Sequence, residues 1–339
     1  MSRRSAVSSI LYKAKFDRLL DAYWGPERLT VLAYHRIIDA SPPSFDLYRP
    51  NVSATPEMFE RHIAYIVKHF NVISLEMLQD FLLTGQALPR RPLLITFDDG
   101  YLDNYTNAYP ILRRYKLPAV IFLITDKMAQ PTAPWWDSCA YYFFHTMKSS
   151  ADLPLLGMCE LVSPAQRDAA RESFIKAVKK LPEAEKQASL QALRLSLDAG
   201  EFNSKLPLFV SWDQVRELTA NGVACQPHTL THPIMTRIDP NEQKWQLTES
   251  RARIEAETGQ AAIAFAYPNG SRHDYNAETM AALRETGYQM AFTLSPGPAR
   301  LADVRAKPLE IRRVFLGYRD SFEIAVLKML GLPALLPER

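Results

Sequence analysis

The chain has 339 residues, of which 47% are hydrophobic and 23% charged, and its formal net charge is +3. This length fits two average domains or one large α/β barrel, and the composition is that of an ordinary globular enzyme. The small charge and the absence of a run of five basic residues argue against nucleic acid as a partner. The three cysteines have no metal-type spacing, so we expect reduced, buried thiols.

The two ends of the chain predict amphipathic helices. The N-terminus has no apolar core of signal-peptide length, and no stretch approaches 18 apolar residues. We therefore expect a protein that is neither exported nor membrane-spanning, and that works in the cytoplasm or at the inner membrane surface. Residues 1–28 form a separate element with a basic amphipathic helix at 7–24, and 319–339 form a C-terminal helix and tail. We expect these ends to pack on the protein, with weak peripheral membrane association as the alternative.

Strand and helix signals alternate along most of the chain. Short apolar, β-branched runs predict strands at residues 29–35, 72–73, 93–97, 119–125, 223–226, 263–267 and 289–294. Helical patterns lie between them, and Thr55 with Pro56 fits a helix start while Ser211 opens a capping box. About seven β/α units result. We therefore predict the α/β class, with an incomplete parallel (β/α)7-type barrel over residues 29–318.

The alternation breaks between about residues 130 and 207. Residues 165–197 are rich in Ala, Lys, Glu, Arg and Leu, which predicts helices and not strands. We expect a helical insertion over one rim of the barrel, in the position of a lid.

Two adjacent carboxylates, Asp98 and Asp99, end the apolar run at 93–97. Such runs are typical of strands buried on both faces, and the C-terminal ends of parallel strands face the barrel mouth, where catalytic residues emerge. The alternative is turn chemistry, with Gly100 supplying an unusual backbone angle. A helical pattern and not a second strand follows Gly100, so a hairpin does not explain the pair.

A pair of histidines follows the strand at 223–226. His228 and His232 have the spacing that places two imidazoles on one side of a helical turn and suits a zinc-type cation. Pro227 and Pro233 limit any helix to one turn, and two such histidines alone are more often surface or core residues. Two strand ends of one barrel can nevertheless bring a histidine pair and an aspartate pair to one metal with an open position for water.

Three motifs follow predicted strands in order, TFDDGY at 96–101, HTLTHP at 228–233 and FAYPNG at 265–270. In this order they resemble the polysaccharide deacetylase family, also called carbohydrate esterase family 4, which includes chitin-deacetylase-like enzymes. The resemblance covers roughly residues 29–314 apart from the insertion. It implies that Asp98 is the general base and that Asp99, His228 and His232 bind a divalent metal, with Zn²⁺ as the expected ion.

The third motif departs from the family pattern. Many members carry an arginine there that orients the base, whereas this chain reads Ala266-Tyr267-Pro268-Asn269. We expect the orienting charge from another strand end, and the candidates are Arg36, Arg312 and Arg313. The resemblance gives substrate or oxyanion contacts to Tyr267, Pro268 and Asn269.

The general acid also departs from the common pattern. Many members place a catalytic histidine late in the chain, but no histidine follows His273 here. Some relatives supply it from an N-terminal strand in a Tyr-His-Arg context, which Tyr34-His35-Arg36 matches. We therefore predict His35 as the general acid, with His273 in reserve and a structural role for His35 as the alternative.

The predicted function is metal-dependent hydrolysis of the N-acetyl group of an amino sugar, with release of acetate. The lack of an export signal favours an intracellular saccharide or a lipid-linked glycan of the kind built at the inner face of a bacterial membrane. Deformylation of a formylated amino sugar is the nearest alternative, and a non-catalytic saccharide-binding protein on the same barrel is the alternative from another class. Trp135 and Trp136 fit either stacking on a sugar ring or anchoring of the insertion.

Overall fold

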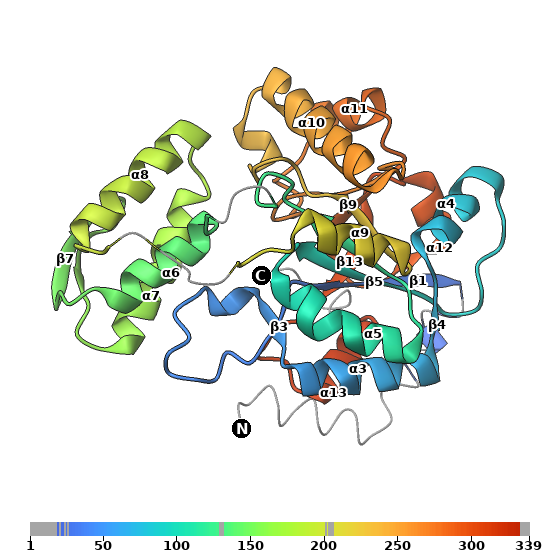
Figure 1. Ribbon diagram of the computed structural model, residues 1–339, viewed down its shortest axis with the longest axis horizontal. Coiled ribbons are helices and arrows are strands. Elements are labelled where there is room, and N and C mark those ends of the chain that lie inside the picture. Colours follow the sequence, from blue (N-terminus) through green and yellow to red (C-terminus); the bar gives the residue numbers. More distant parts are fainter. Residues whose placement is uncertain are drawn as a thin grey trace.

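The computed structural model describes residues 19, 22–23, 25, 27–128, 132–200, 202 and 207–332 (Figure 1). The expected helix at 7–24 therefore lies outside the described residues, apart from Leu19, Ala22 and Tyr23, and so does the tail after residue 332. In the described part, no helix is both long and apolar enough to cross a membrane. The three cysteines are free, and Cys159 is only half-buried whereas Cys139 and Cys225 are buried as expected.

Seven parallel strands form a nearly closed barrel. Their hydrogen-bonded order is β10 (Ala264–Ala266), β11 (Met290–Pro296), β13 (Ile311–Phe315), β1 (Arg28–Tyr34), β5 (Pro92–Asp99), β6 (Ala119–Leu123) and β9 (Val223–Pro227). Every residue of β1 and β5 is buried, because these strands have side chains packed on both faces. The prediction of an α/β protein with an incomplete parallel (β/α)7-type barrel is confirmed.

The seam of the barrel lies between β9 and β10, and within the described chain no ladder hydrogen bonds join these two strands. The side chain of Gln226 bridges the seam instead. Its Oε1 accepts hydrogen bonds from the backbone N–H groups of Ile263 and Ala264, each at 2.9 Å. A single buried amide therefore satisfies two donors that a closing strand would otherwise have to pair.

One barrel strand differs from the prediction. β13 has no counterpart among the expected strands, because Arg312 and Arg313 interrupt its apolar pattern. The expected strand at 72–73 instead lies outside the barrel, where β4 (Asn71–Val72) pairs only with the start of β5. A further short strand, β12 (Ala299–Arg300), runs antiparallel to the start of β1.

Helices cover the outside of the barrel (Figure 1). They are α3 (Pro56–His69), α4 (Leu75–Thr84), α5 (Tyr109–Tyr115), α9 (Trp212–Ala220), α10 (Pro240–Thr258), α11 (Ala277–Glu285), α12 (Leu301–Ala306) and α13 (Phe322–Met329). Shorter elements are β2 (Arg36–Ile37), η1 (Arg49–Asn51), β3 (Val52–Ala54), the π-helical turn η2 (Asn104–Ala108) and η3 (Met235–Arg237). The predicted caps at Thr55 and Ser211 are present. α13 buries its apolar side chains in the same core as α3, which favours packing over membrane contact at this end.

The insertion forms a separate lobe beside the barrel (Figure 1). It contains α6 (Trp135–His145), β7 (Ser150–Leu153), β8 (Gly157–Glu160), α7 (Pro164–Val178) and α8 (Glu183–Ser196). Its own apolar core includes Phe143, Phe174 and Leu193. The predicted helices over 165–197 are present as α7 and α8, whereas the antiparallel β7–β8 hairpin was not expected.

A buried hydrogen-bond network joins the insertion to the barrel. Asp137 of α6 accepts from the Tyr101 hydroxyl at 2.7 Å and from the backbone N–H of Tyr48 at 2.8 Å. The indole N–H of Trp136 donates to the same Tyr101 hydroxyl at 2.8 Å, and the Arg36 guanidinium lies 4.6 Å from the Tyr101 ring centroid. Trp136 and Asp137 thus hold the insertion in place over the turn that follows β5.

A candidate metal centre at the barrel mouth

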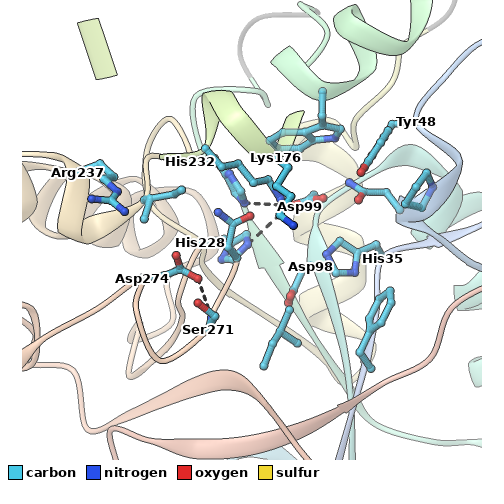
Figure 2. A pocket seen from close by; sticks show the side chains of 18 of the residues that line it. His35, Tyr48, Asp98, Asp99, Lys176, His228, His232, Arg237, Ser271 and Asp274 are labelled. Carbon is cyan, nitrogen blue, oxygen red and sulfur yellow. Dashed lines mark hydrogen bonds and ion pairs between the residues drawn. The ribbon is translucent and has the colours of Figure 1, made fainter. Parts of the chain in front are cut away.

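A cavity of about 510 Å³ opens at the C-terminal ends of the barrel strands, between the barrel and the insertion (Figure 2). The predicted site residues that line it are His35, Asp98, Asp99, His228, His232 and Asn269. The barrel topology therefore brings four strand ends together, those of β1, β5, β9 and β10. Trp136 and three lysines of the insertion form the opposite wall.

The end of β5 turns sharply and separates its two carboxylates. Asp99 has φ 74° and Gly100 has φ 80°, and a Cβ at residue 100 would lie 2.5 Å from Cδ2 of Leu123. A non-glycine residue in this left-handed region costs about 1–3 kcal/mol, and such residues cluster at functional sites. Asp99 consequently faces the histidine loop, whereas Asp98 faces Arg313.

Asp99, His228 and His232 converge on one point (Figure 2). Oδ1 of Asp99 lies 3.7 Å from Nε2 of His228 and 3.6 Å from Nε2 of His232, which is too long for hydrogen bonds. Both carboxylate oxygens of Asp99 are buried, with no hydrogen-bond partner in the part of the chain described. Three donors at about 2.1 Å from one tetrahedral ion stand roughly 3.4 Å apart. The donor set and its spacing therefore fit a divalent cation such as Zn²⁺.

Hydrogen bonds from neighbouring elements fix the histidine loop, residues 228–232. Nδ1 of His228 donates a hydrogen bond to the carbonyl of Ala266 at 2.7 Å. Because a carbonyl can only accept, Nδ1 carries the proton of the neutral ring. Nε2, on the side of Asp99, therefore keeps a lone pair that can bind a metal. Oε1 of Gln246 accepts from the backbone N–H groups of Leu230 and Thr231, each at 3.0 Å. The segment between the two histidines is an irregular loop and not a helical turn, with His232 at φ 64°.

The protonation equilibria of the three residues favour a bound cation. Burial, followed by the charge of Asp98, raises the pKa of Asp99 well above its usual value. Burial also lowers the pKa of His228, and it lowers that of His232 further with help from His228. A positive ion between the three side chains would stabilise the ionised form of Asp99 and would bind the neutral form of both imidazoles.

Arg313 supplies the charge that the third motif lacks. Its two terminal nitrogens bond the two oxygens of Asp98 at 2.7 and 2.8 Å, and its Nε donates to the carbonyl of Thr293. Both side chains are almost completely buried. Burial alone would raise the pKa of Asp98, but Arg313 and then His228 and His35 lower it to about 2. Asp98 is therefore a fixed, ionised carboxylate.

The other two candidate arginines lie elsewhere. The guanidinium of Arg36 bonds Asp103 at 2.8 Å, and that of Arg312 bonds the carbonyl of Pro296. Neither residue lines the cavity. As orienting groups for Asp98, Arg36 and Arg312 are wrong, because their strand positions direct the side chains to other partners.

His35 stands at the end of β1 beside Asp98 (Figure 2). Its backbone N–H donates to Ser53 Oγ at 2.9 Å, its carbonyl accepts from Asn104 Nδ2 at 2.7 Å, and its ring meets Phe315 edge-on. Its Nδ1 is buried with no hydrogen-bond partner in the described chain. Burial lowers the pKa of His35 to about 4 although Asp98 opposes the shift, so the imidazole is neutral at pH 7.

Only one residue of the third motif reaches the cavity. Asn269 lines it with φ 59°. The next residue must be glycine, because a Cβ on Gly270 would lie 2.8 Å from the backbone nitrogen of Leu294. The Tyr267 hydroxyl donates to the carbonyl of Leu309 at 2.9 Å, and neither Tyr267 nor Pro268 lines the cavity. The expected substrate contacts of these two residues therefore have no support in the geometry, and the exposed His273 is also outside the cavity.

Several lining residues have no signal in the sequence. They are Tyr48, Lys176, Lys179, Lys180, Arg237 and Asp274. Lysines near a helix C-terminus are common because they complement the helix dipole, so their pattern alone indicates an ordinary surface. Their place at the barrel mouth depends on how the insertion packs.

Comparisons with known proteins agree with the barrel fold and identify the family. The profile of the family described as polysaccharide deacetylase matches residues 85–291, more than half of the chain. YxkH of Bacillus subtilis, which is named as a polysaccharide deacetylase, is 22% identical over 88% of this chain and 78% of its own length. The poly-β-1,6-N-acetyl-D-glucosamine N-deacetylase of Staphylococcus aureus is 35% identical over 24% of this chain and 28% of its own length. The structure of Streptococcus pyogenes deacetylase PplD in complex with acetate superposes with a TM-score of 0.60 at 19% identity, covering 90% of this chain and 99% of that one.

Proposed function

This chain belongs to the polysaccharide deacetylase family, and from that premise we propose that it is a metal-dependent hydrolase that removes the N-acetyl group from an amino sugar in a saccharide. The observation that carries the proposal is the division between the two adjacent carboxylates. Asp98 is paired with Arg313, whereas Asp99 lies beside two histidines and neither of its oxygens has a hydrogen bond within the described residues. This division suits amide hydrolysis by a metal enzyme, in which one carboxylate can bind the metal while the other acts as general base.

Asp99, His228 and His232 would hold the metal. A bound divalent ion supplies Lewis acidity, which makes water easier to deprotonate and polarises the carbonyl of the acetyl group. The hydrogen bond from His228 to Ala266 fixes the orientation of the ring that faces the site. Trp136 covers the outer histidine, with its ring centroid 4.7 Å from that of His232.

Asp98 would act as the general base. Arg313 keeps it ionised and holds both of its oxygens, so the carboxylate is oriented before substrate binds. A carboxylate of such low pKa is a weak base by itself, and it suits water that has already been acidified.

His35 would deliver the proton to the leaving amine. The neutral imidazole first needs a proton, and the nearby charge of Asp98 is the interaction that favours its protonated form. His35 and Asp98 line the same cavity. The proton that Asp98 takes from water could therefore pass to His35, which would then deliver it to the leaving amine. Asn269 is the lining residue of the third motif that remains for contact with the acetyl oxygen.

The acetamido sugar is the substrate that the family and the named relatives support. No feature of the cavity favours a formyl over an acetyl group. A non-catalytic binding module has no need of a fixed base beside three metal-ligand side chains, so the retained set favours an enzyme.

The test combines metal analysis with product detection. We expect the purified protein to bind one divalent ion per chain and to release acetate from N-acetylated saccharides, to lose this activity with a chelator, and to regain it with Zn²⁺. Formate release from N-formylated analogues without acetate release would indicate a deformylase. Saccharide binding without either product would indicate a binding module, and full activity in the metal-free protein would contradict the metal role.

A further inference from the structure

Four cationic side chains line the outer part of the cavity. Lys176 lies in the last turn of α7, Lys179 is the C-cap of this helix and Lys180 follows it, whereas Arg237 comes from η3 on the barrel side. Figure 2 shows Lys176 and Arg237 on different sides of the metal centre. The insertion and the barrel therefore contribute positive charge to the same opening.

These cations differ from other basic residues of the insertion. Arg171 on α7 bonds Asp168 and Glu172, and Lys186 on α8 bonds Glu183. Among the described residues, by contrast, the side chains of the four cavity cations have no hydrogen bond or ion pair to a carboxylate. Arg167 and Lys148 of the insertion bond backbone carbonyls, so the four cavity cations are distinguished by lining the opening without a bonded counter-ion in the described chain.

The acidic residues of the cavity do not cancel this charge. Asp98 is bonded to Arg313, and Asp99 belongs to the proposed metal centre. Asp274 is the remaining lining carboxylate, and one of its oxygens accepts from the backbone N–H of Ser271 at 2.8 Å. Four cations thus face one unassigned acid, in addition to the charge of the metal.

Lys179 is the strongest sign that a ligand is expected here. Its side chain is half-buried, and burial lowers its pKa although Asp274, Glu172 and Asp99 oppose the shift. A partly desolvated ammonium without a bonded counter-ion is unfavourable, and an anion in the cavity would relieve it. The helix dipole accounts for lysines at the end of α7, but it does not require three of them to line a cavity.

We propose that the cavity binds an N-acetylated saccharide that carries an anionic group, a carboxylate or a phosphate, close to the sugar that loses its acetyl group. This inference rests on the proposed function and deepens it by naming the substrate class. Lysines bind carboxylates and phosphates as compact charges that need no fixed geometry, so they would steer and hold the anion while the acetamido group lies at the metal centre. Lys176, Lys180 and Arg237 are exposed to water, so a neutral polymer would leave only the half-buried Lys179 without a compensating charge, whereas an anion could bind all four.

The test compares a neutral disaccharide with two derivatives that carry an anion at the reducing end, one of which keeps the sugar ring closed while the other is an open-chain acid. The compounds are N,N′-diacetylchitobiose, its 1-phosphate and its aldonic acid, which carries a carboxylate at the reducing end. We expect kcat/KM of the metal-loaded enzyme to be roughly tenfold higher for an anionic form than for the neutral disaccharide, and the difference to shrink at high salt. The two anionic arms tell which group is preferred.

The matched variants are Lys176→Gln with Lys180→Gln, and Lys68→Gln as the control. Lys68 is exposed on α3 and does not line the cavity. We expect the double variant to lose the anionic preference, a loss of roughly tenfold in the ratio of kcat/KM values, and the control to keep it. Binding of the same compounds, followed by calorimetry, reads the preference independently of turnover.

The outcomes separate this inference from the proposed function. Acetate release with equal kcat/KM for all three compounds, unchanged in the double variant, overturns the anionic substrate and leaves the deacetylase. Selective binding of the anionic forms that disappears in the double variant, without any acetate release, supports the anion site and overturns the activity. Absence of both selective binding and release overturns both.

Discussion

Replacement of Arg313 tests whether the buried pair with Asp98 organises the site. Arg313→Gln leaves the Asp98 carboxylate buried with no charged partner, and breaking such a pair costs about 3–5 kcal/mol. A lower bound follows from the pKa of Asp98, which lies at about 2 against an ordinary 3.8, equivalent to about 2 kcal/mol. We expect a loss of stability in this range in urea denaturation at pH 7. Because the folded-state pKa is depressed, this contribution is complete above about pH 4 and is lost as the pH falls toward 2.

The variant Arg313→Lys keeps the charge but cannot make two parallel hydrogen bonds. We expect a smaller loss of stability and a clear loss of kcat, because Asp98 would no longer be held in one orientation. Arg312→Gln is the matched control on the same strand, since Arg312 bonds a carbonyl and not Asp98. Equal unfolding midpoints for Arg313→Gln and the wild type, or an equal loss of kcat in Arg312→Gln and Arg313→Lys, would refute the reasoning.

Three further predictions concern stability. His62 is buried, and its pKa is lowered to about 4 by burial and then by Arg61. The unfolded chain therefore binds a proton at this residue below about pH 6.5 while the folded protein does not, so the free energy of unfolding should fall by about 3 kcal/mol between pH 6.5 and pH 4. His62→Gln should remove this part of the pH dependence in urea denaturation. Gln226→Met should cost about 2–4 kcal/mol in urea denaturation, because two buried N–H groups at the seam lose their acceptor; an unchanged midpoint would mean that the seam is closed by other contacts. Gly270→Ala should destabilise the protein by about 1–3 kcal/mol more than Gly259→Ala, since both glycines have positive φ but only the first meets backbone atoms; equal midpoints would contradict the crowding.

The barrel could be predicted from the sequence because it depends on local patterns, and the residues of the candidate metal centre could be predicted from their places after strands together with the family resemblance. The apolar run that ends at Asp98 and Asp99 marks a buried strand, and the C-terminal ends of parallel strands meet at one face. His228 and His232 follow another such strand, so topology alone brings the two pairs together. The conformation of the loop between the two histidines could not be predicted from the sequence, because the flanking prolines allow either one helical turn or the irregular loop observed.

The features that were missed depend on long-range packing. Arg313 and Asp98 are 215 residues apart, and no local pattern distinguishes Arg313 from Arg36 and Arg312 as the partner of Asp98. Arg312 and Arg313 also hide β13 from a search for apolar runs, because they interrupt its apolar pattern. Each strand of the hairpin β7–β8 has only four residues; β7 alternates between exposed and buried side chains, but β8 does not. The lysines of α7 acquire their position at the barrel mouth only when Trp136 and Asp137 fix the insertion.

The central claim is that two adjacent carboxylates have different tasks, Asp99 in metal binding and Asp98 in proton transfer. The most direct test measures metal stoichiometry and the rate of acetate release side by side for Asp98→Asn and Asp99→Asn. We predict that Asp98→Asn keeps one metal ion per chain and loses about 10²–10⁴-fold in kcat, whereas Asp99→Asn loses most of the metal together with the activity. Full metal occupancy in Asp99→Asn, or a nearly normal rate in Asp98→Asn, would contradict the account.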